Sequence, residues 1–190
     1  MALELHGTTG VDLIQDGTVV TADLASGAIT SSVLPTGTPL QVVSVHKSDT
    51  FSYYGTTFLD VTGLSLSITP SSTSSKILVT GQILLGSSTG FTYIRLVRDS
   101  TAINIGDAAS NRPRITAQFP YDSAEGQYGV VGTPIMYLDS PSTTSATTYK
   151  IQLAGSSVQT NYVNRTAADR DTTGYEARAA SSLIAMEIAG

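Results

Sequence analysis

From residue 39 onward, short apolar runs alternate with turn residues, and this pattern limits the chain to a fold built from β-strands. The clearest run is Leu64-Ser-Leu-Ser-Ile68, in which apolar and polar side chains alternate strictly. Such alternation places one face of a strand in a core and the other face in water. β-Branched and aromatic residues fill the runs, while Gly, Pro, Ser and Asn separate them. Helical spacing of apolar residues is limited to a possible turn at Ala177–Ala180.

The runs predict about ten strands, with a bulge or bend where two of them meet at Gly81. Phe58–Val61 and Leu64–Ile68 are expected as separate strands, divided by Gly63. The fold class we predict is therefore all-β: an antiparallel β-sandwich, jelly-roll-like because eight strands in two sheets suit about 150 residues. The apolar runs from which these strands are expected are 41–45, 58–61, 64–68, 76–80 with its continuation 82–85, 91–97, 102–105, 114–119, 130–138, 147–153, 158–163 and 183–188.

Residues 1–35 are organised differently, because they carry a ten-residue repeat with glycines at 7, 17 and 27. Repeats of this kind bury their apolar face only against a neighbour, and three such units are too short to enclose a core. We therefore predict an extended N-terminal arm that attaches the protein and holds a trimer together, joined by a linker at 36–40 to a β-sandwich at 41–190. A flexible acidic leader with a chance repeat is the alternative. The predicted attachment and trimerisation residues are Ile14, Val19, Leu24, Ile29 and Leu34.

Charge is scarce and acidic overall, which narrows the partners. Charged residues make up 13% of the chain, about half the usual share, and the net charge is −5. A nucleic-acid-binding protein needs a basic surface, so we expect no nucleic-acid partner. No apolar run approaches the length of a membrane-spanning helix, so we expect no membrane insertion. The N-terminus lacks the basic and apolar regions of a secretory signal peptide.

Catalytic motifs are few. Gly86-Ser-Ser-Thr-Gly90 matches the nucleophile elbow of α/β-hydrolases, but both histidines, His6 and His46, precede Ser88. In that family the histidine follows the serine and a helix follows the motif, whereas a strand is expected here. We interpret the motif as a β-hairpin loop, and we predict no enzymatic activity and no cofactor. Asn164-Arg-Thr166 matches a glycosylation sequon, to which we assign no role because no signal peptide is recognised.

A group of carboxylates at Asp169, Asp171 and Glu176 could ligate calcium through oxygen atoms. However, the spacing of an EF-hand is absent, and Arg170 would compete for the same carboxylates. We interpret this stretch as a solvated loop with local ion pairs, and a weak metal site is the alternative.

Aromatic and guanidinium side chains in the turn-rich segments are the candidate binding residues. Tyr offers a flat apolar face with a polar tip, which suits sugar rings and protein surfaces alike. Arg adds a fork of donors for carboxylates or carbonyls. The alternative is that several of these tyrosines complete strands or pack between subunits. The candidates for ligand or receptor binding are Tyr53, Tyr54, Tyr121, Tyr128, Tyr162, Tyr175, Asn111 and Arg112.

Several stretches resemble tail-fibre and related virion proteins of tailed bacteriophages. The start Met1-Ala-Leu-Glu-Leu-His-Gly-Thr-Thr-Gly10 is similar to their N-termini, and the unit 27–34 is similar to the repeats of their trimeric shafts. The run 60–79 resembles a segment of their C-terminal β-domains, as do 137–150 and the closing 184–190.

The resemblance implies a homotrimeric component on the exterior of a phage particle, made in the cytoplasm of the bacterial host. We expect a short tail fibre whose arm contacts other virion proteins and whose β-domain binds a host surface glycan or protein. Tail fibres are often much longer than this chain. A trimeric capsid decoration, cement or head-fibre protein that stabilises the particle without a host ligand is therefore the alternative, and a carbohydrate depolymerase is a third.

Overall fold

The structure is a computed structural model that describes residues 34–119, 127–172, 174 and 176–190. These residues contain eleven strands and no helix. The helical turn expected at Ala177–Ala180 is wrong, because Arg178 instead forms an isolated β-bridge with Arg165. Among the described residues, no helix is long and apolar enough to cross a membrane. The strands are β1 Pro39–Lys47, β2 Phe51–Tyr54, β3 Leu59–Ile68, β4 Lys76–Ser87, β5 Thr92–Arg98, β6 Thr101–Ile103, β7 Ala117–Phe119, β8 Val131–Asp139, β9 Thr147–Gly155, β10 Thr160–Val163 and β11 Ser181–Ile188.

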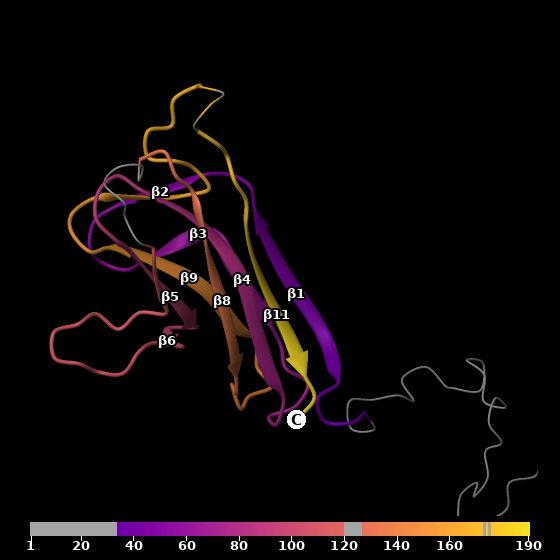
Figure 1. The fold of residues 1–190 in the computed structure, drawn as a ribbon. Helices are drawn as coiled ribbons and strands as arrows, with labels where there is room; N and C mark the ends of the chain where they lie inside the picture. The colour runs from indigo at the N-terminus through magenta and orange to yellow at the C-terminus, as the bar shows by residue number, and fades with distance from the viewer. Residues whose placement is uncertain (1–33, 120–126, 173, 175) are drawn as a thin grey trace, which may run out of the picture. The chain divides into compact units, whose positions relative to one another are not determined.

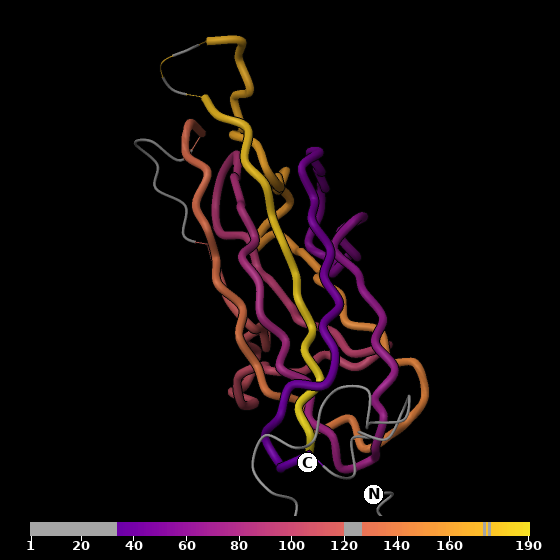
Figure 2. The backbone as a smooth tube through the Cα atoms, turned by 90° about the vertical axis from the view of Figure 1, so that its right-hand side faces the viewer, coloured from indigo at the N-terminus to yellow at the C-terminus, as the bar shows by residue number. Residues whose placement is uncertain are grey.

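The strands form two antiparallel sheets, which we call sheet A and sheet B (Figure 1). Sheet A places β1, β11, β4 and β8 side by side, while β10 follows β11 along β4 and carries β2 on its other side. Sheet B places β3, β9 and β5 side by side, and the short β6 and β7 share the free edge of β5. Figure 2 shows the yellow β11 between the indigo β1 and the magenta β4.

This strand order is that of a jelly roll. We count β6 and β7 as one interrupted strand and leave out the short β2 and β10, which gives eight strands in chain order. Sheet A then reads first, eighth, third and sixth, and sheet B reads second, seventh, fourth and fifth. Two interlocked Greek keys produce this order. The prediction of an antiparallel, jelly-roll-like sandwich is confirmed.

The core lies between the sheets and follows the alternation in the sequence. In β3 the buried residues are Val61, Leu64, Leu66 and Ile68, while Ser65 and Ser67 face solvent. Facing strands contribute Ile83, Ile94 and other apolar residues to the same cluster. Because side chains on a strand alternate between the faces, each apolar run supplies one layer of this core.

Two expectations about glycines differ from the structure. The runs on either side of Gly63 form the single strand β3, whose pairing with β9 shifts register between Asp60 and Ser65. No bulge occurs at Gly81, which lies in an unbroken register with both β8 and β11. At Gly81 the missing side chain matters for another reason: a Cβ there would lie 2.4 Å from the backbone oxygen of Ser182.

The residues before β1 are tied to the end of the chain. Gly37 donates to the oxygen of Ala189 at 2.7 Å, and the Ala189 amide donates to the oxygen of Thr38 at 2.8 Å. Residues Thr36–Gly190 form one compact unit, so part of the predicted linker 36–40 belongs to the sandwich and β1 begins at Pro39. The repeat-bearing arm lies outside the described residues except for Leu34 and Pro35, and its role stays a prediction.

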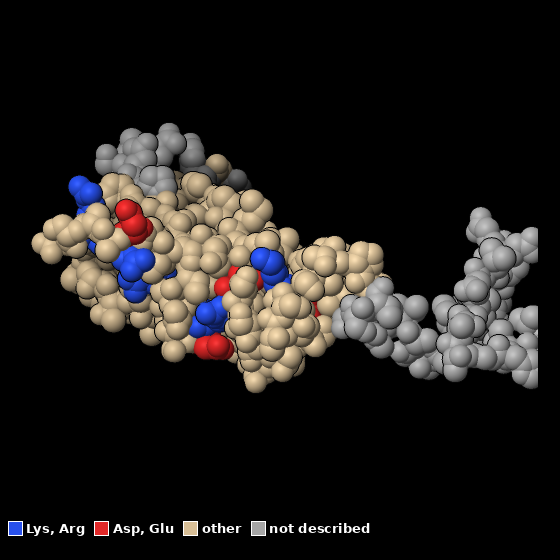
Figure 3. Space-filling model, turned by 90° about the horizontal axis from the view of Figure 1, so that it is seen from below, with Lys and Arg blue, Asp and Glu red and all other residues tan. Residues whose placement is uncertain are grey.

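Charged side chains are sparse on the face of the molecule that is seen from below (Figure 3). Seen from below, a few patches of Lys, Arg, Asp and Glu interrupt a surface made mostly of other residues (Figure 3).

Candidate functional site

The two ends of the sandwich differ, and we call the end away from Thr36 the distal end. At the distal end β4 runs out beside the start of β8 and beside β10, since Leu85 pairs with both Val131 and Val163. At the other end Lys76 pairs with Ile188, next to the contact between Thr38 and Ala189. The segment that leads from β10 to β11 extends beyond the distal end (Figure 1).

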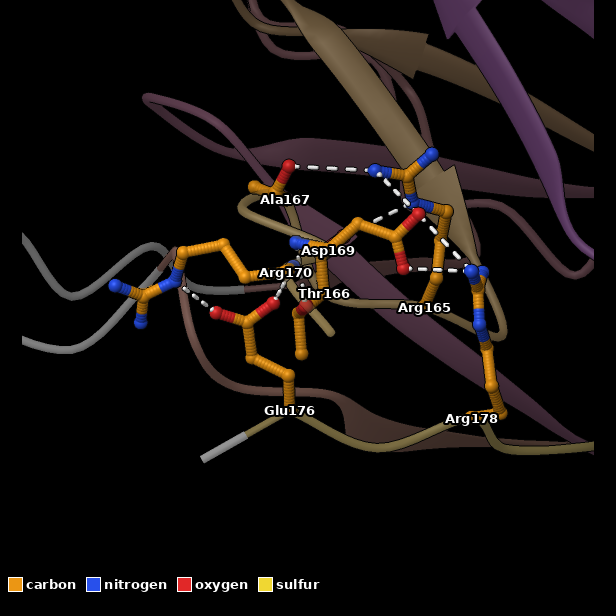
Figure 4. Close-up of polar contacts among 7 residues, drawn as sticks. All are labelled: Arg165, Thr166, Ala167, Asp169, Arg170, Glu176 and Arg178. Atoms are coloured by element: carbon orange, nitrogen blue, oxygen red, sulfur yellow. Dashed lines mark hydrogen bonds and ion pairs between the residues drawn. The ribbon is translucent and has the colours of Figure 1, made fainter. Parts of the chain in front are cut away.

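That segment contains three arginines and two carboxylates in close contact, which we call the arginine cluster: Arg165, Arg170, Arg178, Asp169 and Glu176 (Figure 4). The carboxylate of Asp169 lies between two guanidinium groups, at 3.1 Å from Arg165 and 2.8 Å from Arg178. The carboxylate of Glu176 lies 2.5 Å from Nε of Arg170 and also accepts from the Arg170 backbone amide. The carboxylates of Asp169 and Glu176 are therefore both paired with arginine side chains.

The electrostatics of the cluster match this pairing. Burial alone would raise the pKa of Glu176, but hydrogen bonds from the side chain and backbone of Arg170 outweigh it and lower the pKa. The hydrogen bond to Glu176 raises the pKa of Arg170 in turn. No group of three or more acidic or histidine side chains suited to a metal ion occurs among the described residues. The local ion pairs predicted around Asp169 and Glu176 are confirmed.

Two of these arginines lie against predicted tyrosines. The guanidinium of Arg165 lies over the ring of Tyr162 at 4.7 Å from its centroid, and that of Arg170 lies over Tyr128 at 4.8 Å. Cation–π contacts of this kind hold both the charge and the ring in a defined orientation. The guanidinium side chains of Arg170 and Arg178 remain 51% and 58% exposed, so they are accessible from solvent.

Four of the predicted tyrosines gather at the distal end. Tyr53 and Tyr54, which were expected in or beside a turn-rich segment, lie on β2, and β2 pairs with β10, where Tyr162 lies. Tyr54 is 67% exposed, whereas Tyr53 and Tyr162 are half-buried. The backbone amide of Ala168 donates to the oxygen of Gln127, which holds the segment bearing Tyr128 against the loop of the arginine cluster.

The other predicted binding residues lie elsewhere. Asn111 and Arg112 are exposed on the loop 104–116, which connects β6 to β7 along the edge of sheet B. The structure therefore does not bring them to the tyrosines at the distal end. Tyr121 and Tyr175 lie outside the described residues, as do Ile14, Val19, Leu24 and Ile29.

The arginines of the cluster were not predicted as site residues. Arg170 was considered only as a competitor for calcium ligands. The signal in the sequence is the interleaving of Arg and carboxylates between Arg165 and Arg178, beside tyrosines. Ion pairs between Arg178 and Asp169, nine residues apart, depend on the course of the loop, which the sequence pattern does not give.

Asn164 secures the base of this loop. Its side-chain amide donates to the oxygens of Lys47 at 2.8 Å and Asp49 at 2.9 Å, and its oxygen accepts from Ser181 at 2.6 Å. The residue is fully buried and has a φ of 62°, a left-handed conformation that Asn tolerates better than most residues. The side-chain nitrogen to which a glycan would be attached is therefore hydrogen-bonded inside the protein, and Asn164 has a structural role in this fold.

Ser88 lies in a loop between the two sheets. Because β4 belongs to sheet A and β5 to sheet B, the motif 86–90 is not the hairpin we expected. The hydroxyl of Ser88 donates to the oxygen of Thr160 at 3.2 Å, and His46 lies exposed on β1. The role of the motif is to carry the chain from one sheet to the other.

Comparison with known proteins yields weak structural matches alone. No family model matches the chain, and no curated protein matches it. The structures found include the VP2 subviral particle of infectious bursal disease virus, at 14% identity and a TM-score of 0.43, covering 82% of this chain and 34% of that chain. The Gt strain of the same virus matches at 14% identity and a TM-score of 0.41, covering 82% and 39%.

The T13 viral particle of infectious bursal disease virus matches at 13% identity and a TM-score of 0.40, covering 80% of this chain and 40% of that chain. Our chain thus spans about a third to two fifths of the chains that it matches. Because the TM-scores lie below 0.5, these matches carry no argument about what the chain does.

Proposed function

We propose that the chain is a non-enzymatic structural component of a virus particle: a short homotrimeric tail fibre of a tailed phage, whose β-domain binds the host surface. The observation that carries the proposal is the polarity of the sandwich. The segment preceding β1 joins at one end, beside Ala189, while the exposed tyrosine and arginines lie at the distal end. A protein that attaches through its N-terminal segment and binds with its tip needs this arrangement.

The distal end offers the chemistry of a weak, broad binding surface. Tyr54 presents an open aromatic ring, and Arg178 presents donors that remain exposed although Asp169 neutralises part of their charge. Such a surface suits glycans or polar protein epitopes through stacking and hydrogen bonds. Three copies on one fibre would raise the apparent affinity through effective concentration even if each site is weak.

A capsid decoration or cement protein is the second candidate, and one observation favours it. The outer face of sheet A exposes the apolar side chains of Val42, Met136 and Leu138, which suit lateral contacts between protein subunits. The two candidates differ in whether the distal end of the sandwich binds a host ligand.

Binding of the fluorescently labelled full-length chain to host cells tests the fibre. We expect saturable binding that Tyr54→Ala and Arg178→Ala each weaken several-fold, because both side chains are exposed at the distal end. Arg112→Ala is the control, since it removes an exposed arginine from the loop 104–116 instead. Absence of binding to every permissive strain would reject the receptor-binding function and leave the decoration protein.

Immunogold labelling of purified particles tests the location independently of any ligand. We expect label at the tail for the fibre, whereas label spread over the capsid supports the decoration protein. Particles that carry no label would contradict the virion proposal altogether.

A further inference from the structure

The outer face of sheet A carries apolar side chains on all four of its long strands toward the end near Lys76, whereas the row of His46, Ser182, Gln82 and Pro134 nearer the distal end is mostly polar. Outward-facing residues alternate with core residues, and the register aligns Val42, Met186, Leu78 and Leu138 in one row from β1 to β8. The next row contains Ser44, Ile184, Thr80 and Met136. Met136 is 74% exposed, Val42 57% and Leu138 50%. Figure 2 looks onto this face, and no described segment crosses it between its ends.

The outer face of sheet B is polar and so provides a comparison with sheet A within the same molecule. There Lys150 pairs with Asp60 at 2.7 Å, and Gln152 donates to the same carboxylate at 2.7 Å. Serines at 65 and 67 continue the polar surface along β3. A polar outer face is the ordinary state of a sandwich in water, so the apolar face of sheet A calls for a partner.

The chemistry of this face favours an uncharged apolar partner. On the outward-facing positions of β1, β11, β4 and β8, Lys76 at the end of the face is the one Lys, Arg, Asp or Glu side chain. Charged partners would therefore lose hydration without finding counter-charges. The same face on a second copy, or the apolar β8 edge of that copy, meets this requirement.

The size of the face is sufficient for such a contact. Four strands about 4.8 Å apart and about eight residues long give roughly 500 Å². Two copies packed on such faces would remove roughly 1,000 Å² from water, which reaches the lower bound for a specific protein interface. Met136 and Leu138 lie on β8, which pairs with β4 alone among the described strands, so the exposed edge and the face form one continuous surface.

We propose that the outer face of sheet A is the surface through which copies of this chain associate, with a second copy covering the rows that contain Val42 and Met136. This deepens the proposed function, because it names a protein surface that would join the protomers of a fibre. It also stands apart from that function, since the association does not depend on a virion.

Light scattering of the full chain after size-exclusion chromatography tests the proposal. We expect a mass of two or three times 19.8 kDa for the wild type and of one protomer for Met136→Glu. Ser65→Glu is the matched control, because it adds the same charge to the outer face of sheet B and should leave the mass unchanged. Far-UV circular dichroism checks that each variant keeps its β-structure. A monomeric wild type, or an oligomeric and folded Met136→Glu, would overturn the proposal.

A second measurement identifies the occupant and avoids a charge on the face. Because the chain has no cysteine, Met136→Cys introduces a single thiol whose alkylation rate reports its cover. We expect alkylation at least about tenfold slower than for Ser65→Cys in the oligomer, with the difference lost where dilution yields monomers. Slow alkylation in a protein with the mass of one protomer would show that residues 1–33 of the same chain cover the face instead, and rapid alkylation in the oligomer would show it uncovered; both contradict the proposal. Either result leaves the virion location to the labelling experiment above.

Discussion

At the scale of single residues, the structure depends on a few polar side chains that no spacing in the sequence reveals. Asn164 joins the end of β1, the start of β11 and the loop of the arginine cluster through one buried amide. In the sequence Asn164 indicates only a turn residue, and its φ of 62° is known only from the structure.

Replacement of Asn164 measures that joint. Asn164→Ala should lower the free energy of unfolding by about 2–4 kcal/mol, because it removes the hydrogen bonds to the oxygens of Lys47 and Asp49 and leaves the buried hydroxyl of Ser181 without its acceptor. Asn164→Gly loses the same hydrogen bonds but accepts the left-handed backbone, so it should be about 1 kcal/mol less damaging. Urea titration of both variants gives the two values. A loss below about 0.5 kcal/mol for Asn164→Ala would show that the joint contributes little.

Glu187 makes stability depend on acid pH. Burial raises the pKa of this carboxyl, but hydrogen bonds from Gln41 and Ser71 outweigh it and bring the pKa below 4.5, the value for an unstructured Glu. Its contribution to stability is therefore complete above that value and is lost as the pH falls through the lower pKa of the folded state. Gln41 donates at 2.5 Å, and the backbone and hydroxyl of Ser71 each donate at 2.7 Å.

We expect Glu187→Gln to be about 1–3 kcal/mol less stable than the wild type at pH 7, because charge-assisted hydrogen bonds are lost. The difference should narrow as the pH falls below about 4.5. Urea titrations between pH 3 and pH 7 measure both curves. Parallel curves over that range would show that the carboxylate of Glu187 does not carry the dependence.

At the scale of elements, the long alternating strands are predictable and their short neighbours are not. Leu64-Ser-Leu-Ser-Ile68 defines β3 because its periodicity alone separates a buried from an exposed face. The four residues of β2 carry no comparable pattern, since Phe51–Tyr54 becomes a strand only through its pairing with β10. Such pairing is long-range information.

Gly81 shows the same limit inside a strand that was predicted. A glycine there suggested a bulge, yet β4 passes through it in regular register because β11 approaches closely. Gly81→Ala should lower the free energy of unfolding by about 2–4 kcal/mol, since a Cβ would lie 2.4 Å from the Ser182 oxygen and 3.2 Å from the Leu183 Cα.

Gly106→Ala is the control for this substitution, because a Cβ at that position would meet no atom within 4 Å. We expect its effect to stay within about 0.5 kcal/mol. Thermal or urea unfolding compares the two variants. Equal changes in the free energy of unfolding for the two variants would mean that β4 and β11 accommodate a Cβ at Gly81 without loss of stability.

At the scale of the whole molecule, the fold class followed from the sequence while the surfaces did not. The β8 run Val-Gly-Thr-Pro-Ile-Met-Tyr-Leu-Asp has apolar residues on both faces, so its strand could be predicted but its exposed side could not. The tyrosines at 53, 54, 128 and 162 were predicted as candidates, whereas the arginines that pack on Tyr128 and Tyr162 depend on the course of the distal loop and were not. Asn111 and Arg112 lie at the edge of sheet B, away from these tyrosines, and this separation follows from the strand topology rather than from their spacing in the sequence.

The pairing of β1 with β11 has a consequence for how the chain reaches its native state. The first long strand of the sandwich finds its neighbour at the far end of the sequence, with more than a hundred residues between them. Closure of sheet A must therefore wait until synthesis of the domain is almost complete, and non-local sheets of this kind fold in milliseconds to seconds rather than microseconds. During that interval the apolar rows of β4 and β8 are present without β11, so newly made copies meet at a stage when premature aggregation competes with correct assembly.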